Sequence, residues 1–93
     1  MDKSAHLHID PTLTWRLLDG EAVIVSPQSG QIRVLNHAGA LIWQMAAEAK
    51  SVGEIIEALM VAYNISADQA QTDLEAFIND LTQRNMMFRE PAG

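Results

Sequence analysis

Residues 31–43 read QIRVLNHAGALIW, and the periodicity of the apolar side chains changes within this stretch. Up to Leu35, polar and apolar residues alternate, as they do in a half-buried strand. Beyond Asn36 the apolar residues recur with helical spacing, and asparagine is a residue type that caps helices. The stretch therefore predicts a strand over residues 31–35 that passes through Asn36 directly into a helix.

Two more strands are predicted upstream, at Thr14–Leu18 and Glu21–Val25. They flank Asp19-Gly20, a dipeptide that suits a two-residue type I′ turn. A second turn signal, SPQSG at residues 26–30, contains a proline early and a glycine at its end. This combination favours a reversal of the chain, so we expect an antiparallel meander of three strands.

The register of the second hairpin depends on whether its loop has an odd or an even number of residues. An even loop would place Arg33 on the same face as Trp15. An odd loop would leave Arg33 on the opposite face, with Arg16 and Glu21. It would gather the apolar side chains of Trp15, Leu17, Ile24, Ile32 and Val34 on one face. We expect the odd loop, because it makes the sheet more amphipathic.

Two further helices are predicted by their caps. SVGE at residues 51–54 is a capping box, and SADQ at residues 66–69 has the same arrangement, with a cap serine followed three residues later by glutamine. The last helix should end near Arg84-Asn85, because asparagine accepts the left-handed conformation. The predicted apolar stripes contain Leu41, Ile42 and Met45, then Ile55, Ile56, Leu59, Met60 and Tyr63, and finally Ala70, Leu74, Phe77, Ile78 and Leu81. The order predicts an α+β fold in which a three-helix bundle covers a three-stranded antiparallel sheet.

The length of 93 residues suffices for one domain. We expect a flexible N-terminal arm over residues 1–12, a folded domain over residues 13–88 and a flexible tail over residues 89–93. Met86, Met87 and Phe88 are expected to fold back onto the core. The absence of cysteine, of a signal peptide and of a long apolar run predicts a soluble cytoplasmic protein that does not enter a membrane.

Residues that could perform chemistry are few. His6 and His8 could chelate a metal ion but have no third ligand nearby, and His37 is expected on the surface of the first helix turn. Glu54 is used as a cap partner, and the other carboxylates lie on polar helix faces. The sequence contains no Ser/His/Asp order and no glycine-rich phosphate loop. We therefore expect no catalytic residues, no metal and no cofactor.

The predicted third strand forms an edge of the sheet, so its outer backbone groups are free to pair. An extended peptide could add there as a fourth strand, beside Phe77 and the acidic Asp73 and Asp80 of the last helix. Alternatively, the edge is only protected by charge, for which Arg33 is a candidate. The pattern by itself leaves both interpretations open.

Several blocks of the sequence resemble the family of coenzyme PQQ synthesis protein D (PqqD), whose domains are also called RiPP precursor-peptide recognition elements. The most specific block is LNHAGALIW at residues 35–43, preceded by DGEAVIV at residues 19–25 and by Gly30. The resemblance continues through SVGEIIEAL at residues 51–59, YNI at residues 63–65, and Asp73-Leu74 with Phe77-Ile78 and Leu81. It covers residues 13–88.

The resemblance implies a winged-helix-like fold and a peptide-binding function without catalysis. Members bind the leader of a ribosomally made precursor peptide and present it to a modifying enzyme, such as a radical S-adenosylmethionine enzyme, or to a leader protease. The leader pairs with the third strand and lies against the third helix. Transferred to this chain, the backbone contacts fall on Gln31, Ile32, Arg33, Val34 and Leu35, and the side-chain contacts fall on Asp73, Ala76, Phe77, Asp80 and Arg84.

The chain departs from the members devoted to PQQ biosynthesis in two respects. Those members usually have Leu-Asp where this chain has Leu35-Asn36, and their first strand region is more basic. The chain therefore looks more like a stand-alone member that serves another peptide product. The family also includes a domain-exchanged dimer, so the resemblance is compatible with a monomer and with a homodimer.

The net charge of −6 bears on the partners. It suggests that acidic residues beside the cleft favour a leader with a Lys or Arg. A winged-helix DNA-binding regulator is an alternative that the helical layout permits, but Asp68, Asp73, Glu75 and Asp80 would repel phosphates. A second alternative is a dimerisation module that uses the same edge strand.

Overall fold

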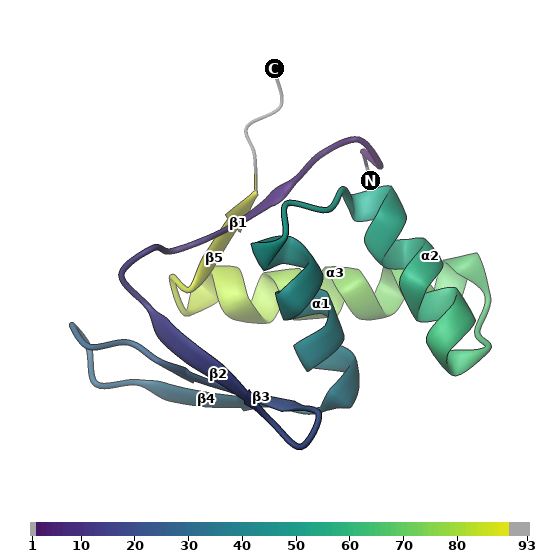
Figure 1. The fold of residues 1–93 in the computed structure, drawn as a ribbon. Coiled ribbons are helices and arrows are strands. Elements are labelled where there is room, and N and C mark those ends of the chain that lie inside the picture. The colour runs from purple at the N-terminus through teal and green to yellow at the C-terminus, as the bar shows by residue number, and fades with distance from the viewer. Residues whose placement is uncertain (1, 90–93) are drawn as a thin grey trace.

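The computed structural model describes residues 2–89 and contains two small sheets and three helices (Figure 1). The elements, in chain order, are β1 (Leu7–Ile9), β2 (Thr14–Leu18), β3 (Glu21–Val25), β4 (Ile32–Leu35), α1 (His37–Ala47), α2 (Val52–Tyr63), α3 (Ala67–Gln83) and β5 (Met87–Arg89). The predicted α+β order, from β2 to α3, is confirmed. Strands β1 and β5 are additional to it.

The main sheet is antiparallel with the order β2-β3-β4, so β4 lies at its edge. The tight turn between β2 and β3 uses Asp19 and Gly20 at φ values of 51° and 80°, as a type I′ turn requires. Gly30, at the end of the second turn, has a φ of 76°. Both predicted turns are confirmed.

The register of the second hairpin differs from the prediction. Val25 pairs with Ile32 and Ile24 pairs with Arg33, so the loop between the strands spans residues 26–31 and is even. Ile32 and Val34 consequently point outward and are 65% and 50% exposed. Arg33 lies on the inner face with Ile24. The expectation of an odd loop is wrong, because the inward charge of Arg33 is matched by Asp80 of α3, a compensation that the strand pattern alone does not show.

The three helices begin at the predicted caps. Asn36 Oδ1 accepts a hydrogen bond from the Gly39 N–H at 2.9 Å, and Ser51 with Glu54 forms the complete capping box. Ser66 accepts from the Gln69 N–H at the start of α3. Asn85 follows α3 with a φ of 58°, the left-handed conformation expected of it. These caps satisfy backbone donors that a helix start would otherwise leave without partners.

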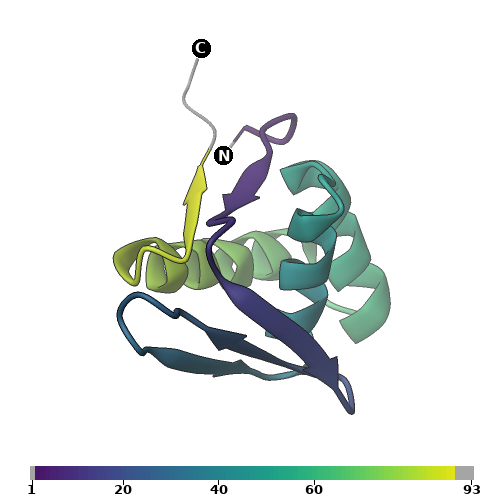
Figure 2. The ribbon, with the colours of Figure 1, turned by 60° about the vertical axis from the view of Figure 1, so that its left-hand side comes forward.

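The core lies between the main sheet and the helices, and α3 passes between the two sheets in both views (Figures 1 and 2). The largest fully buried side chains are Trp43, Ile24, Ile55, Leu59, Leu74, Ile78, Leu81 and Met86. Trp15 of β2 meets Trp43 of α1 edge to face at a centroid distance of 6.0 Å. This pair joins sheet and helices, as aromatic pairs commonly do in cores. No described helix is long and apolar enough to cross a membrane.

The N-terminal segment is part of the fold. Instead of the flexible arm expected over residues 1–12, the structure places Leu7–Ile9 in β1, antiparallel to β5. Leu7 is 3% exposed, and Met86 and Met87 are buried as predicted. Phe88, also expected on the core, is instead half exposed and stacks on His8. Arg89, expected in the flexible tail, ends β5, and residues 90–93 lie outside the described residues. The short strand escaped prediction because its partner lies at the other end of the chain.

The contribution of β1 to stability can be measured at Leu7. We expect Leu7→Ala to lower the free energy of unfolding by about 2–4 kcal/mol, because it removes a buried side chain and leaves a cavity. Leu18→Ala is the matched control, because Leu18 is 49% exposed, and its effect should stay below about 1 kcal/mol. Urea unfolding of the three proteins gives both values, and equal effects would show that β1 adds nothing to the core.

Candidate functional site

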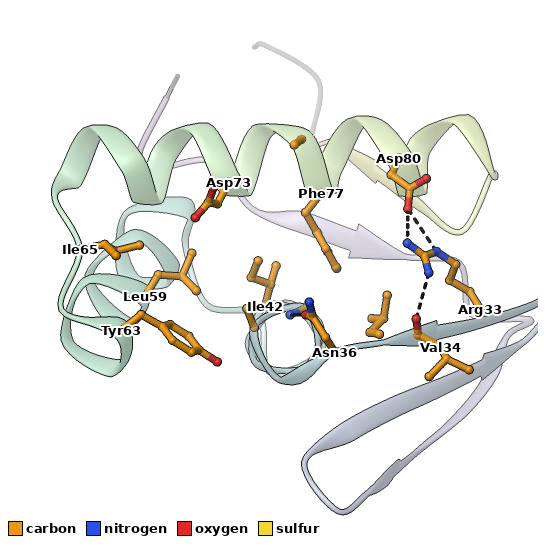
Figure 3. Close-up of a pocket in the computed structure, with 14 residues that line it drawn as sticks. Arg33, Val34, Asn36, Ile42, Leu59, Tyr63, Ile65, Asp73, Phe77 and Asp80 are labelled. Atoms are coloured by element: carbon orange, nitrogen blue, oxygen red, sulfur yellow. Dashed lines mark hydrogen bonds and ion pairs between the residues drawn. The ribbon is translucent and has the colours of Figure 1, made fainter.

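A cleft of about 650 Å³ opens between the edge strand β4 and helix α3, with α1 and α2 closing its base (Figure 3). Its lining residues come from all four elements and the short connections between them. They are Arg33, Val34, Leu35, Asn36, Ala38, Gly39, Ile42, Leu59, Tyr63, Ile65, Asp73, Ala76, Phe77 and Asp80. The volume is within the range of pockets that bind small molecules or single side chains of a partner.

The base of the cleft is apolar. Phe77 points from α3 into the cleft above Ile42, and Leu59 closes the side toward α2 (Figure 3). Gly39 of α1 allows this arrangement: a Cβ there would lie 3.2 Å from Leu35 Cβ and 3.3 Å from Phe77 Cε2. The Phe77 ring can therefore approach the first turn of α1, where a larger residue would push it away.

The outer edge of β4 presents backbone groups that do not bond to β3. The Ser26 N–H donates to the Gln31 carbonyl at 2.9 Å, which directs the backbone of Gln31 toward β3. Backbone groups along an antiparallel strand alternate in direction. Arg33 and Leu35 therefore bond to β3, whereas the N–H and C=O groups of Ile32 and Val34 point away from the sheet. These groups face the space where a further strand would lie.

Arg33 links this edge to α3. Its Nε and Nη2 donate to Asp80 Oδ2 at 3.2 and 3.0 Å, and its Nη1 donates to the carbonyl of Val34 at 2.9 Å (Figure 3). One guanidinium thus spans from helix α3 to the outward-facing carbonyl of the edge strand. Arginine suits this position because its donors form a planar fork.

Asp80 is shared by two arginines, since Arg84 Nε donates to its other oxygen at 3.0 Å. Burial raises the pKa of the Asp80 carboxyl. The hydrogen bonds from Arg84 and Arg33 and the charges of both arginines outweigh burial, and the pKa lies below its ordinary value of 3.8. The carboxylate therefore stays charged at neutral pH and holds the two arginines together.

The opposite end of the cleft has a different character. Asp73 Oδ1 accepts a hydrogen bond of 2.7 Å from the uncharged amide of Gln69, one turn earlier on α3. Tyr63, at the end of α2, is 42% exposed and lines the same end of the cleft, with Leu59 between it and Asp73 (Figure 3). This end thus presents an acidic and a phenolic group, whereas the other end presents arginines.

The structure brings most of the residues named from sequence together. Seven of them line the cleft: Arg33, Val34, Leu35, Asp73, Ala76, Phe77 and Asp80. Arg84 reaches it through Asp80, whereas Gln31 and the side chain of Ile32 lie outside it. The cleft also contains residues that the sequence does not mark as site residues: Asn36, Ala38, Gly39, Ile42, Leu59, Tyr63 and Ile65. Leu59 and Tyr63 belong to a predicted apolar stripe, and only the position of Tyr63 at the end of that stripe indicates that it could reach the cleft.

Metal ligands do not gather in residues 2–89: no group of three or more His, Cys, Asp or Glu side chains is placed to hold an ion. The chemistry available at the cleft is hydrogen bonding by outward-facing backbone groups, apolar contact and ion pairing.

The family model of coenzyme PQQ synthesis protein D (PqqD) matches residues 21–87. The chain belongs to the PqqD family. Two solved structures share its fold, described as "TbiB1 in Complex with the TbiA(beta) Leader Peptide" and "Lasso peptide synthetase B1 complexed with the leader peptide". Both are 24% identical to this chain, with TM-scores of 0.84 and 0.82. They cover 92% and 90% of this chain and 99% of their own chains. No curated protein matches the chain.

Acid should weaken the link between α3 and β4. Because the pKa of Asp80 is lower in the folded chain than in the unfolded chain, its contribution to stability is complete well above pH 3.8 and is lost as the pH falls through the folded pKa. We expect Asp80→Asn to lower the free energy of unfolding by up to about 1 kcal/mol at neutral pH.

This difference between the wild type and Asp80→Asn should shrink as the pH falls below 3.8. Urea unfolding of both proteins over the acid range measures it. A difference that stays the same down to the lowest pH at which both proteins fold would show that the charge of Asp80 is not what stabilises the fold.

Proposed function

We propose that this protein is a peptide chaperone that binds the leader of a ribosomally synthesised precursor peptide by strand addition to β4. The observation that carries the proposal is the edge of β4, where outward backbone groups stand beside an apolar cleft. Membership of the PqqD family supports it. So do the two solved structures of the same fold, which are described as complexes with leader peptides.

The edge of β4 and the cleft contribute differently to peptide recognition. Ile32 and Val34 each offer one N–H and one C=O to an added strand. Such main-chain bonds give affinity that does not depend on the amino-acid sequence of the peptide. Side chains of an added strand alternate between the two faces of the sheet. Every second leader side chain would therefore face the cleft, where Phe77, Ile42 and Leu59 select apolar groups.

The proposed role is to hold a peptide and not to modify it. The residues that meet at the cleft form hydrogen bonds, ion pairs and apolar contacts, and they do not form a nucleophile with its base. The chemistry would belong to a partner enzyme, either a radical S-adenosylmethionine enzyme or a leader protease. The outward side chains of Ile32 and Val34 lie next to the proposed leader and would extend the surface offered to that enzyme.

The direct test is titration of the protein with the leader of a precursor peptide encoded near its gene, followed by amide chemical shifts. We expect saturable binding, with the largest shifts in residues 31–35 and in the part of α3 that contains Asp73, Phe77 and Asp80. Shifts confined to residues outside β4 and α3 would contradict the proposal.

A proline at Val34 tests strand addition itself. Val34→Pro removes an outward N–H while leaving the bonds to β3 intact, and we expect it to weaken leader binding about five- to tenfold. Leu17→Pro is the matched control: by the same alternation it removes an outward N–H from β2, at the opposite edge of the sheet. Equal loss of affinity in both variants would mean that the leader does not pair with β4.

The two alternative functions predict different results in the same preparations. If β4 pairs with a second copy of the chain, sedimentation without peptide will show a concentration-dependent dimer, and Val34→Pro will disrupt it. A DNA-binding regulator would instead bind duplex DNA with a steep salt dependence.

A further inference from the structure

The guanidinium of Arg33 lies where a leader strand has to bond. The Val34 carbonyl points out of the sheet, and Arg33 Nη1 is 2.9 Å from it. An added strand would direct one of its own N–H groups at the same oxygen. In the structure described here, Arg33 therefore caps the acceptor that the leader would use.

Arg33 contacts the Val34 carbonyl through a single nitrogen. Arg33 holds Asp80 through Nε and Nη2, and only Nη1 reaches Val34. Both side chains are about one third exposed, at 35% and 34%, so the guanidinium is accessible from the cleft. Because the guanidinium is rigid and planar, Nη1 can leave the carbonyl only if the whole group pivots on Asp80 Oδ2, the one oxygen that accepts from both Nε and Nη2.

The charges around Arg33 do not balance. Asp80 is the bonded carboxylate of both Arg33 and Arg84, so this cluster of three side chains has a net charge of +1. At the other end of the cleft, Asp73 is bonded to a neutral amide. Asp73 and Asp80 are seven residues apart on α3, which corresponds to about 10 Å. The cleft thus has a positive end and a negative end.

We propose that Arg33 is an exchangeable cap that selects an acidic leader. When the leader adds to β4, its backbone N–H replaces Arg33 Nη1 on the Val34 carbonyl, and the released Nη1 binds an Asp or Glu side chain of the leader. The proposal rests on the function proposed above and adds the charge of the ligand to it. It reverses the expectation, drawn from the net charge, that the leader meets this cleft with a Lys or Arg.

The exchange also orients the leader. An acidic residue placed at Arg33 fixes one end of the peptide, and the same residue placed at Asp73 would meet a like charge. Residues on one face of a strand are two or four apart, about 7 or 13 Å. Consider a leader whose successive cleft-facing side chains are first acidic, then apolar, and then neutral or basic. Such a leader therefore fits in one direction only.

The test uses peptides selected from a random display library on the full 93-residue protein, with binding at β4 established by amide shifts. We expect Asp or Glu to be enriched at one position among the peptides that shift residues 31–35. Replacing that residue by Asn or Gln in the strongest binder should weaken binding about five- to tenfold, as expected for a charge-assisted hydrogen bond at a partly exposed site.

Two protein variants test whether Arg33 causes this preference for an acidic residue. In Arg33→Gln the acidic peptide should lose its advantage over the neutral peptide, and the neutral peptide should bind no more weakly than it binds the wild type, because the cap is easier to displace. Arg16→Gln is the matched control, since it changes the net charge equally at an exposed position of β2 outside the cleft. It should keep the preference.

The possible failures are distinguishable. Peptides that shift β4 without acidic enrichment, or a preference that survives in Arg33→Gln or disappears in Arg16→Gln, would overturn the role of Arg33 and leave leader binding in place. If no selected peptide perturbs β4, the proposed function fails and the inference fails with it.

Discussion

The junction at Asn36 places the edge of the sheet beside the helices. Strand β4 ends at Leu35 and α1 begins at His37, so one residue makes the connection. The bond from the Gly39 N–H to Asn36 Oδ1 fixes that residue as a helix cap. With no loop to absorb a change of direction, the position of α1 sets the position of β4. Helix α3, packed on α1 through Phe77 and Gly39, then forms the second wall of the cleft.

Features set by neighbouring residues could be predicted from the sequence. Asp19-Gly20, Asn36 and the box from Ser51 to Glu54 each act within a few residues of the chain, so their turns and caps follow from local chemistry. Two features failed because they depend on distant residues. Strand β1 is held by β5, across the full length of the chain. The inward position of Arg33 depends on Asp80, which is 47 residues away.

The residues of the candidate site likewise divide into those that the sequence predicts and those that it does not. Residues of β4 and α3 could be named through the resemblance to the PqqD family, which implies contacts on one strand and one helix, and most of the residues named in this way line the cleft. The α2 side of the cleft could not, because Leu59 and Tyr63 continue an apolar stripe that looks like ordinary core. The charge of the cleft does not follow from the net charge of the chain. A net charge of −6 describes the whole chain, whereas the field in a cleft is set by the few groups that line it.

The two interpretations of the edge strand, protection and peptide binding, turn out to be compatible. An unpaired edge strand risks pairing with other chains, and proteins commonly block such edges with charged side chains. Arg33 blocks this edge by bonding to the Val34 carbonyl, and it does so with a group that is anchored on α3 and accessible from the cleft. One hydrogen bond of this kind costs less to break than a covering helix or loop would cost to displace. The residue that protects the edge in the free protein is therefore well placed to decide which peptide opens it.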